Sequence, residues 1–223
     1  SSALNKTSNV LEQLMITEKA FYKNSAMLEG IEHKKIKMVP KKMLDEQTSQ
    51  PHQGMIATFK VNKKTMSFQE ILEKANMVIL LDQITDPHNV GAIVRSANAF
   101  GATAVITTSK NAATDSPIIA KSSSGAIEDT PLVTVTNLTV AMQKLQDAGF
   151  WTVGLDGYAK ASLAQVDLKG KIAFVMGSEG KGIRDLVKKN CDVLAKLPMT
   201  GSVESLNVSV ACGISLYEYA KQN

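Results

Sequence analysis

Near its C-terminus the chain contains the stretch Leu197-Pro198-Met199-Thr200-Gly201-Ser202-Val203-Glu204-Ser205-Leu206-Asn207-Val208-Ser209-Val210-Ala211. It continues an apolar run from Val193 that is typical of a buried strand. Its middle is rich in turn and capping residues, and from there the apolar spacing becomes helical as far as about Lys221. The stretch predicts a strand, a loop and a helix whose first backbone N–H groups can face a ligand. An ordinary connection between a strand and a helix would have the same sequence features.

The remainder of the chain from Met77 alternates apolar runs with helical patterns, which predicts an α/β fold with a mainly parallel sheet. The expected helices begin or end at typical capping residues, such as Gly101 and Gly149 at C-termini. The expected strands cover residues 77–81, 104–108, 132–135, 150–155, 172–176 and 193–197, and the expected helices cover residues 89–100, 138–148 and 183–190. A further helix should start at Ser116, with Pro117 in its first turn.

The first third predicts a small mixed α/β module, with strands at residues 9–16, 36–39 and 52–59 and helices that start at Thr17 and Lys41. A short helix should follow Ser67, because Ser67 and Glu70 have the capping-box spacing. We therefore expect one domain over residues 1–62, a linker over residues 63–75 and a second domain over residues 76–223.

The bulk composition fits a globular cytoplasmic protein. The chain has 223 residues, is 44% hydrophobic, and has no apolar run of membrane-spanning length. The N-terminus lacks the apolar core of a signal peptide. Cys191 and Cys212 have no disulfide or metal-ligand spacing, and the histidines are scattered, so we expect reduced thiols and no metal site.

The positive charge is concentrated in the first module. Residues 1–75 contain twelve lysines and eight acidic residues, whereas residues 76–223 contain thirteen basic and thirteen acidic residues. A lysine-rich module beside a neutral domain fits attraction to a nucleic-acid backbone. A solvated surface with ordinary lysines explains the same charge distribution.

Several kinds of site are missing from the sequence. It has no Ser-His-Asp or Cys-His pattern, no phosphate-binding loop ending in Gly-Lys-Ser or Gly-Lys-Thr, and no dinucleotide fingerprint after the first strand of the second domain. A ligand held by backbone loops at the carboxyl ends of the strands remains compatible with the pattern.

Two upstream stretches, taken together with the C-terminal one, indicate a function. They are Leu81-Asp82-Gln83-Ile84-Thr85-Asp86-Pro87-His88-Asn89-Val90-Gly91-Ala92-Ile93-Val94-Arg95-Ser96-Ala97 and Phe174-Val175-Met176-Gly177-Ser178-Glu179-Gly180-Lys181-Gly182-Ile183. In this order the three stretches resemble the motifs of the SpoU family of RNA ribose 2′-O-methyltransferases. These enzymes belong to the SPOUT class, so the resemblance implies a C-terminal domain tied in a trefoil knot.

The resemblance also implies a cofactor, S-adenosylmethionine, held mostly by main-chain groups. It places the cofactor against Gly177, Leu197 and Leu206, with Met176 and Met199 nearby. Gly177 would let a ligand approach the backbone, and the leucines would form an apolar wall for the adenine ring. Plain core packing is the other explanation for these residues.

The residues that the resemblance makes candidates for catalysis are Arg95, Asn89, Glu179, Ser205 and Asn207. Arg95 stands among apolar and small residues, which favours a buried, aimed side chain over a surface one. Because a guanidinium keeps its proton, contact with a phosphate or with the developing alkoxide is physically easier than action as a base. Glu179 would fix Arg95 or a neighbouring amide, or cap a helix. Asn89 and Asn207 have helix capping as their alternative role, and Ser205 would bind the ribose hydroxyl or cap.

The resemblance implies RNA as the partner and a homodimer as the assembly. The first module, with His52-Gln53-Gly54, looks like the ribosomal-protein-L30e-like RNA-binding domain of one branch, which methylates a guanosine ribose in large-subunit ribosomal RNA. That domain usually starts with a further glycine-containing segment, so we expect it here to be shortened or cut. His52 and Gln53 would contact RNA or serve the fold. The alternatives are a transfer-RNA methyltransferase and a noncatalytic RNA-binding or ribosome-assembly factor.

Overall fold

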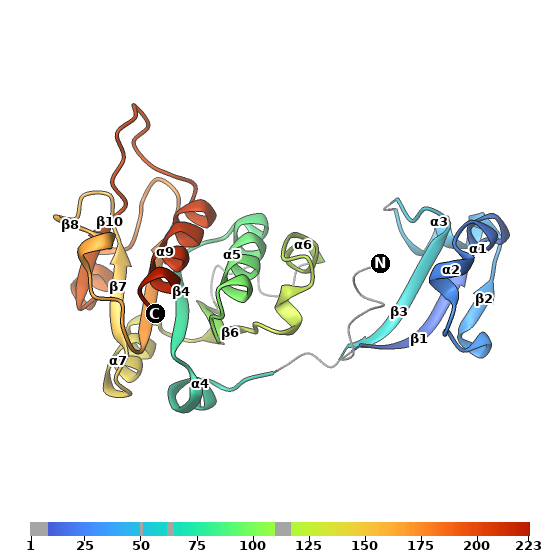
Figure 1. Cartoon of the computed structure of the whole chain (residues 1–223), viewed down its shortest axis with the longest axis horizontal. Coiled ribbons are helices and arrows are strands. Elements are labelled where there is room, and N and C mark those ends of the chain that lie inside the picture. The colour runs from blue at the N-terminus through green and yellow to red at the C-terminus, as the bar shows by residue number, and fades with distance from the viewer. Residues whose placement is uncertain (1–8, 50, 62–64, 110–116) are drawn as a thin grey trace. The chain divides into compact units, whose positions relative to one another are not determined.

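The structure is a computed structural model and describes residues 9–49, 51–61, 65–109 and 117–223. By its internal contacts the chain divides into two compact units, Ser1–Asn62 and Lys63–Asn223 (Figure 1). The extreme N-terminus, from which we argued against a signal peptide, lies outside the described residues. No helix in the described part of the chain has both the length and the apolar character that crossing a membrane requires.

The first unit is built on a three-stranded sheet of order β2-β1-β3. The central strand pairs in parallel with β2 and antiparallel with β3. The predicted cap of the first helix is present, since Thr17 Oγ1 accepts a hydrogen bond from Ala20 N at 3.3 Å. In chain order the elements are β1 (Asn9–Ile16), α1 (Glu18–Lys23), α2 (Ser25–Leu28), η1 (His33–Lys35), β2 (Ile36–Met38), α3 (Lys41–Gln47) and β3 (Met55–Val61).

The second unit contains a seven-stranded sheet of order β6-β5-β4-β9-β7-β10-β8, in which all strand pairs are parallel. The predicted α/β class with a mainly parallel sheet is confirmed. The elements are α4 (Phe68–Lys74), β4 (Met77–Asp82), α5 (Pro87–Ala99), β5 (Ala104–Thr108), α6 (Pro117–Ser122), η2 (Ala126–Glu128), β6 (Leu132–Val135), α7 (Leu138–Asp147), β7 (Trp151–Leu155), β8 (Ala161–Ser162), η3 (Leu163–Gln165), β9 (Ile172–Gly177), α8 (Asp185–Lys189), β10 (Val193–Lys196) and α9 (Val208–Gln222).

The sheet of the second unit is buried on both faces, as its continuous apolar strands require. Side chains alternate across a strand, so Met77, Ile79 and Leu81 of β4 enter one core cluster and Val78 and Leu80 enter the other. The first cluster includes apolar residues of α5 and α9, and the second includes residues of α4, α7 and α8. Because the helices cover the two faces of the sheet, a site is expected at the loops that follow the carboxyl ends of the strands.

Several elements differ in their bounds from the sequence prediction, among them β3, which is Met55–Val61 instead of residues 52–59. The helix expected from residue 89 begins at Pro87, after the N-cap Asp86. The helix expected over residues 183–190 is shorter, Asp185–Lys189. The helix predicted after Ser67 is present as α4 with its capping box, and its Ile71 is fully buried in the core of the second unit. The trefoil knot depends on how the chain threads rather than on strand order, and stays a prediction.

Candidate functional site

Three side chains from the three motif stretches form one hydrogen-bonded cluster. Asn89 Nδ2 donates to Glu179 Oε1 at 3.0 Å. Asn207 Nδ2 donates to the same Glu179 Oε1 at 2.7 Å and to Asn89 Oδ1 at 3.0 Å. The fold therefore brings together three of the residues predicted for catalysis, although they come from α5, from the loop after β9 and from the start of α9.

Asn89 does not cap its helix, contrary to the alternative that the sequence left open. The cap of α5 is Asp86, whose Oδ1 accepts a hydrogen bond from His88 N at 2.9 Å. Asn89 lies in the first turn and is buried, with 8% of its surface exposed. Its whole side-chain amide is therefore available to Glu179 and Asn207.

Asn207 is the N-cap of α9 and also a member of the cluster. Its Oδ1 accepts hydrogen bonds from Ser209 N at 2.9 Å and from Ser209 Oγ at 2.6 Å. Because the two ends of the amide have different partners, the cap fixes the orientation in which Nδ2 reaches Glu179. Capping and a place in the site are both properties of this residue.

Glu179 lies in a tight loop that Gly177 and Gly182 make possible. Ser178 N donates to Gly182 O at 3.1 Å, and Gly182 N donates to Ser178 O at 2.8 Å. A Cβ on Gly177 would lie 2.1 Å from the Gly182 carbonyl carbon. The loop's own backbone therefore requires glycine at this position, and the expected role of Gly177 in the approach of a ligand stays a prediction.

Arg95 is not where the sequence predicted it. The apolar residues around it suggested a buried, aimed side chain, yet Arg95 is on the exposed side of α5. Within the described residues its guanidinium has no hydrogen bond or ion pair, and Glu179 is held by the two asparagine amides instead. The spacing of apolar residues on α5 describes the buried face of the helix, and Arg95 is on the other one.

A cavity of about 290 Å³ lies at the carboxyl ends of β7, β9 and β10 and at the start of α9. All the residues predicted to hold the cofactor line it, together with Glu179 and Ser205, whereas Asn89, Arg95 and Asn207 are not in its wall. The cofactor candidates in its lining are Met176, Gly177, Leu197, Met199 and Leu206. Asp156 and Lys188 add a charged pair to the wall, with Nζ and Oδ2 2.7 Å apart.

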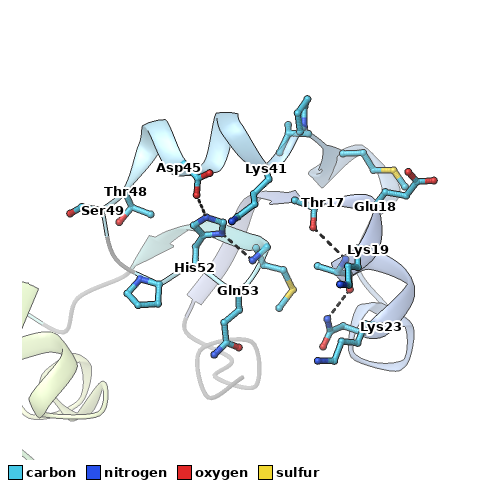
Figure 2. Close-up of a pocket in the computed structure, with 18 residues that line it drawn as sticks. Thr17, Glu18, Lys19, Lys23, Lys41, Asp45, Thr48, Ser49, His52 and Gln53 are labelled. Carbon is cyan, nitrogen blue, oxygen red and sulfur yellow. Dashed lines mark hydrogen bonds and ion pairs between the residues drawn. The ribbon is translucent and has the colours of Figure 1, made fainter.

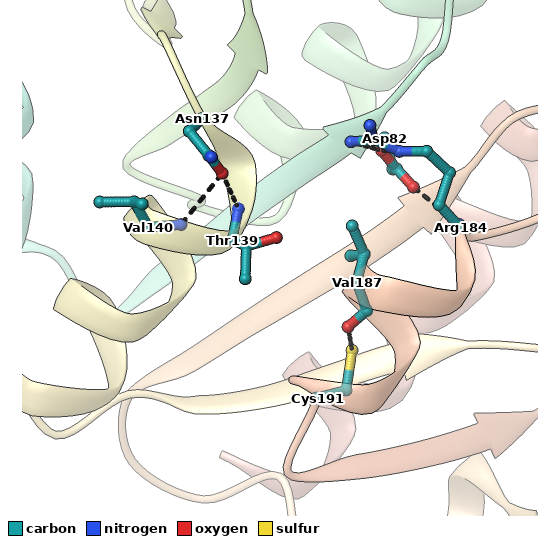
Figure 3. A network of polar contacts seen from close by, with 7 residues as sticks. All are labelled: Asp82, Asn137, Thr139, Val140, Arg184, Val187 and Cys191. Carbon is teal, nitrogen blue, oxygen red and sulfur yellow. Dashed lines mark hydrogen bonds and ion pairs between the residues drawn. The ribbon is translucent and has the colours of Figure 1, made fainter.

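One ion pair that the sequence analysis missed anchors the loops of this site (Figure 3). Asp82, at the end of β4, is 1% exposed. Its Oδ1 accepts hydrogen bonds from Arg184 Nε at 2.8 Å and pairs with Nη2 at 2.6 Å, and its Oδ2 accepts from Arg184 N at 2.8 Å. The sequence signal that could have revealed the pair is Asp82 itself, a carboxylate at the end of an otherwise apolar strand. The pair joins the first motif stretch to the residue that precedes α8.

The cysteines are built as unreactive thiols. Burial raises the pKa of Cys191 to about 12, helped by the charges of Asp192 and Asp82, and the thiol contacts Val187 O at 3.4 Å (Figure 3). Burial alone raises the pKa of Cys212 to about 12. Among the described residues, no group of three or more His, Cys, Asp or Glu side chains could hold a metal ion.

The first unit has a concave surface between α1, α3 and residues 51–55, and the hollow that it forms has a volume of about 1600 Å³ (Figure 2). Lys19, Lys23 and Lys41 line it, as do His52 and Gln53. The surface is open to solvent and carries more positive than negative side chains, because Glu18 and Asp45 are the acids of its lining.

His52 holds the loop of this surface in place. Its Nε2 is 2.8 Å from Asp45 Oδ1, and its Nδ1 accepts a hydrogen bond from Gly54 N at 3.0 Å. Hydrogen bonding to His52 lowers the pKa of the Asp45 carboxyl. Both ring nitrogens therefore have protein partners, whereas Gln53 is exposed at a backbone φ of 51°. Of the two residues, Gln53 is the one free to contact a ligand.

Comparison with known proteins agrees with the motif stretches. Residues 76–217 match the model of the SpoU rRNA Methylase family. The chain is 46% identical over 176 residues to the 23S rRNA (guanosine-2′-O-)-methyltransferase RlmB of Pseudomonas putida, over 77% of this chain and 71% of that protein. It is 43% identical over 193 residues to the protein of the same name from Coxiella burnetii, over 84% and 77% of the two chains.

The fold is similar to that of a solved structure with a cofactor. The SpoU methyltransferase AviRb from Streptomyces viridochromogenes, crystallised in complex with AdoMet, superposes with a TM-score of 0.76. The match covers 96% of this chain and 83% of that chain at 23% identity, so it concerns the fold alone.

We expect Arg184→Ala to lower the free energy of unfolding by about 3 kcal/mol, because the Asp82 carboxylate would stay buried without its counterion. Urea unfolding followed by circular dichroism measures this loss. Lys34→Ala is the control, since it removes an exposed pair with Glu32 and should leave the midpoint unchanged. An equally small effect for both variants would mean that the backbone N–H alone satisfies Asp82.

Proposed function

Because the chain belongs to the SpoU rRNA methylase family, we propose that it transfers a methyl group from S-adenosylmethionine to the 2′-hydroxyl of a guanosine ribose in 23S ribosomal RNA. The observation that carries this proposal is the Asn89–Glu179–Asn207 cluster beside a cavity lined by all the predicted cofactor residues. The cluster joins three stretches that are far apart in sequence, and one of its members, Glu179, is also part of the cavity wall.

The cavity fits the methyl donor in chemistry and size. Its volume is near the lower end of ligand pockets. Leu197 and Leu206 offer an apolar wall for the adenine ring, and Asp156 and Lys188 offer charges for the polar groups of the methionine part. When bound, S-adenosylmethionine supplies an electrophilic methyl group on a cationic sulfonium. The rigid loop after Gly177 would hold backbone groups against it without rearrangement.

The cluster leaves one carboxylate oxygen for the substrate. Both asparagine amides bind Glu179 Oε1, and Oε2 has no hydrogen bond or ion pair within the part of the chain that the structure describes. We assign Oε2 to accept the hydrogen bond of the ribose 2′-hydroxyl, with Ser205 on the same cavity wall as a second contact. The amides fix the carboxylate in place, so orientation costs little when the substrate binds.

Arg95 has a role that suits its exposure. A guanidinium keeps its proton at physiological pH and pairs with phosphate through several N–H donors. We therefore assign Arg95 to the phosphate beside the target ribose. A role as general base is not needed for this assignment.

The protein acts as a homodimer in this proposal. The exposed side of α9 carries Val210, Ile214 and Tyr217, at 50%, 42% and 59% exposure, and their spacing places them along one side of the helix. Such a stripe on a helix whose other side is in the core is compatible with a second copy packing against it. The site would be completed near that contact.

We assign RNA binding to the first unit as well. Lys19, Lys23 and Lys41 on the concave surface can follow a phosphate backbone, and Gln53 can contact a base. Lysine contacts of this kind supply affinity without sequence reading. The second unit then acts on a substrate that the first unit has already captured.

Methyl transfer tests the proposed activity. With radiolabelled S-adenosylmethionine, we expect label in unmodified 23S ribosomal RNA, at one position that resists alkali. Glu179→Gln should lower kcat about 100-fold. The neutral amide is a weaker acceptor than the carboxylate for the ribose 2′-hydroxyl, which must lose its proton during methyl transfer. Arg95→Ala should mainly raise KM for RNA.

Glu73→Gln is the matched control, since Glu73 is an exposed glutamate on α4. Label only in transfer RNA would show that transfer RNA, and not 23S ribosomal RNA, is the substrate. Binding of RNA without any transfer would favour the noncatalytic factor.

A salt series tests the first unit. The triple variant Lys19→Ala, Lys23→Ala and Lys41→Ala should weaken RNA binding and reduce the slope of log K against log salt by about 2, because each phosphate contact contributes roughly 0.7–0.9. The control is Lys34→Ala, Lys35→Ala and Lys37→Ala, which removes equal charge outside the concave surface. Equal slopes for the two variants would refute a specific role for this surface.

Sedimentation velocity tests the assembly. Ile214→Asp with Tyr217→Asp should shift the wild-type dimer to monomer, because two charges would be buried in an apolar contact. Val140 is 53% exposed on α7, and Val140→Asp should leave the dimer intact. A wild-type protein that is a monomer at micromolar concentration would exclude the dimer.

A further inference from the structure

The turn after β7 presents an aromatic side chain at the mouth of the cavity. Tyr158 is 93% exposed, the highest value among the large exposed hydrophobic residues of the described chain. It lines the same cavity as Glu179 and Ser205. Its ring has no aromatic contact and its hydroxyl no hydrogen bond with any described residue. Within the described part of the chain, the ring therefore has no structural partner.

The backbone under Tyr158 is nevertheless firmly held. Tyr158 N donates to Asp156 Oδ1 at 3.0 Å, and Ala159 N donates to Asp156 O at 3.0 Å. Asp156 N in turn donates to Ala195 O at 2.9 Å, and Asp156 Oδ2 pairs with Lys188 Nζ at 2.7 Å. The turn is thus tied to β10 and to α8.

The charge of Asp156 is secured by the same contacts. Burial raises the pKa of Asp156, but the hydrogen bonds from Lys188 and from the Tyr158 N–H outweigh it and hold this pKa below its usual value. The contacts that order the turn therefore also favour the charged form of its anchor. A ring on a pre-ordered turn loses little backbone entropy when it binds a partner.

The surroundings of the ring favour nucleic acid. Lys160 follows on the same loop, and Lys181 lines the cavity from the loop after β9; both are exposed. An exposed aromatic ring flanked by lysines offers stacking to a base and charge to the neighbouring phosphates. Bases in single-stranded or looped RNA are recognised in this way.

We propose that Tyr158 is a stacking platform for a nucleobase adjacent to the target nucleotide. This inference rests on the proposed function, because it places RNA at the cavity mouth. It goes beyond that function by naming a residue that would hold the base beside the target nucleotide and so position the RNA for methyl transfer. The ring is too exposed to enclose the adenine of the cofactor, for which Leu197 and Leu206 form the wall.

Steady-state kinetics with 23S ribosomal RNA fragments test the proposal. Tyr158→Ala should raise KM for RNA about 10-fold, as expected for the loss of one stacked base, while KM for S-adenosylmethionine and the melting temperature stay unchanged. Tyr158→Phe and Tyr158→Trp should retain wild-type KM, because the ring is kept. Tyr158→Leu should behave like Tyr158→Ala.

Trp151→Ala is the matched control. Trp151 is 49% exposed at the first residue of β7, the opposite end of that strand from the cavity, so KM for RNA should not change. A second readout is 2-aminopurine fluorescence, placed at the base next to the target, which should be quenched by the wild type and not by Tyr158→Ala.

The outcomes separate this inference from the proposed function. If the wild type methylates RNA but Tyr158→Ala has wild-type KM and quenching, the stacking platform is excluded and the activity stands. A change confined to KM for S-adenosylmethionine would also overturn it, by assigning the ring to the cofactor. If the wild type transfers no methyl group but quenches 2-aminopurine through Tyr158, the activity fails while the platform stands.

Discussion

The side chain of Asn207 joins the fold of the C-terminal helix to the geometry of the site. Its Oδ1 caps α9, and its Nδ2 binds Glu179 and Asn89. A cap is a local requirement, because the first N–H groups of a helix lack partners. Here the same amide is also the point where three motif stretches meet, so the start of α9 cannot move without moving the carboxylate.

The parallel sheet makes this meeting possible. Strands β4 and β9 are neighbours in register, with Asp82 opposite Gly177, so their following loops leave the sheet side by side. Gly177 allows the second loop to fold back on its own backbone, and the Asp82–Arg184 pair ties that region to the end of β4. A buried ion pair is a weak source of stability, but one that is bonded on both oxygens specifies a single arrangement of the two loops.

Local sequence patterns predicted most of the fold. The apolar strands, the capping box of Ser67 and the small-residue helix after Asn207 each follow from short-range rules. What failed required three-dimensional information. Apolar spacing on α5 could not tell on which side Arg95 lies. The packing of Ile71 of α4 in the core of the second unit likewise depends on residues that are distant in sequence.

The site was predicted in the same uneven way. Motif resemblance selected Asn89, Glu179 and Asn207 and allowed Glu179 an amide partner, but it could not say which amides bind it. The Asp82–Arg184 pair joins residues about a hundred positions apart and has no local sequence signal for its partner. Gly177 also meets a requirement of the loop's own backbone, which the sequence did not show. Glycine at a loop is a local signal, and whether the missing Cβ makes room for a ligand or for the chain itself depends on the path of the backbone.

The groups assigned to the two substrates differ in how the protein holds them. Glu179, assigned to the ribose, is held firmly: two amides fix its carboxylate, and the loop that carries it is closed on itself. Those assigned to RNA, namely Arg95, Tyr158 and the lysines of the first unit, are exposed side chains without a structural task. The difference follows from the ligands. Methyl transfer needs atoms aligned within fractions of an ångström, whereas a polyanion is attracted over a Debye length and its bases stack on any accessible ring. An exposed arginine on the first motif helix fits this proposed division, because a phosphate can reach it without entering the core.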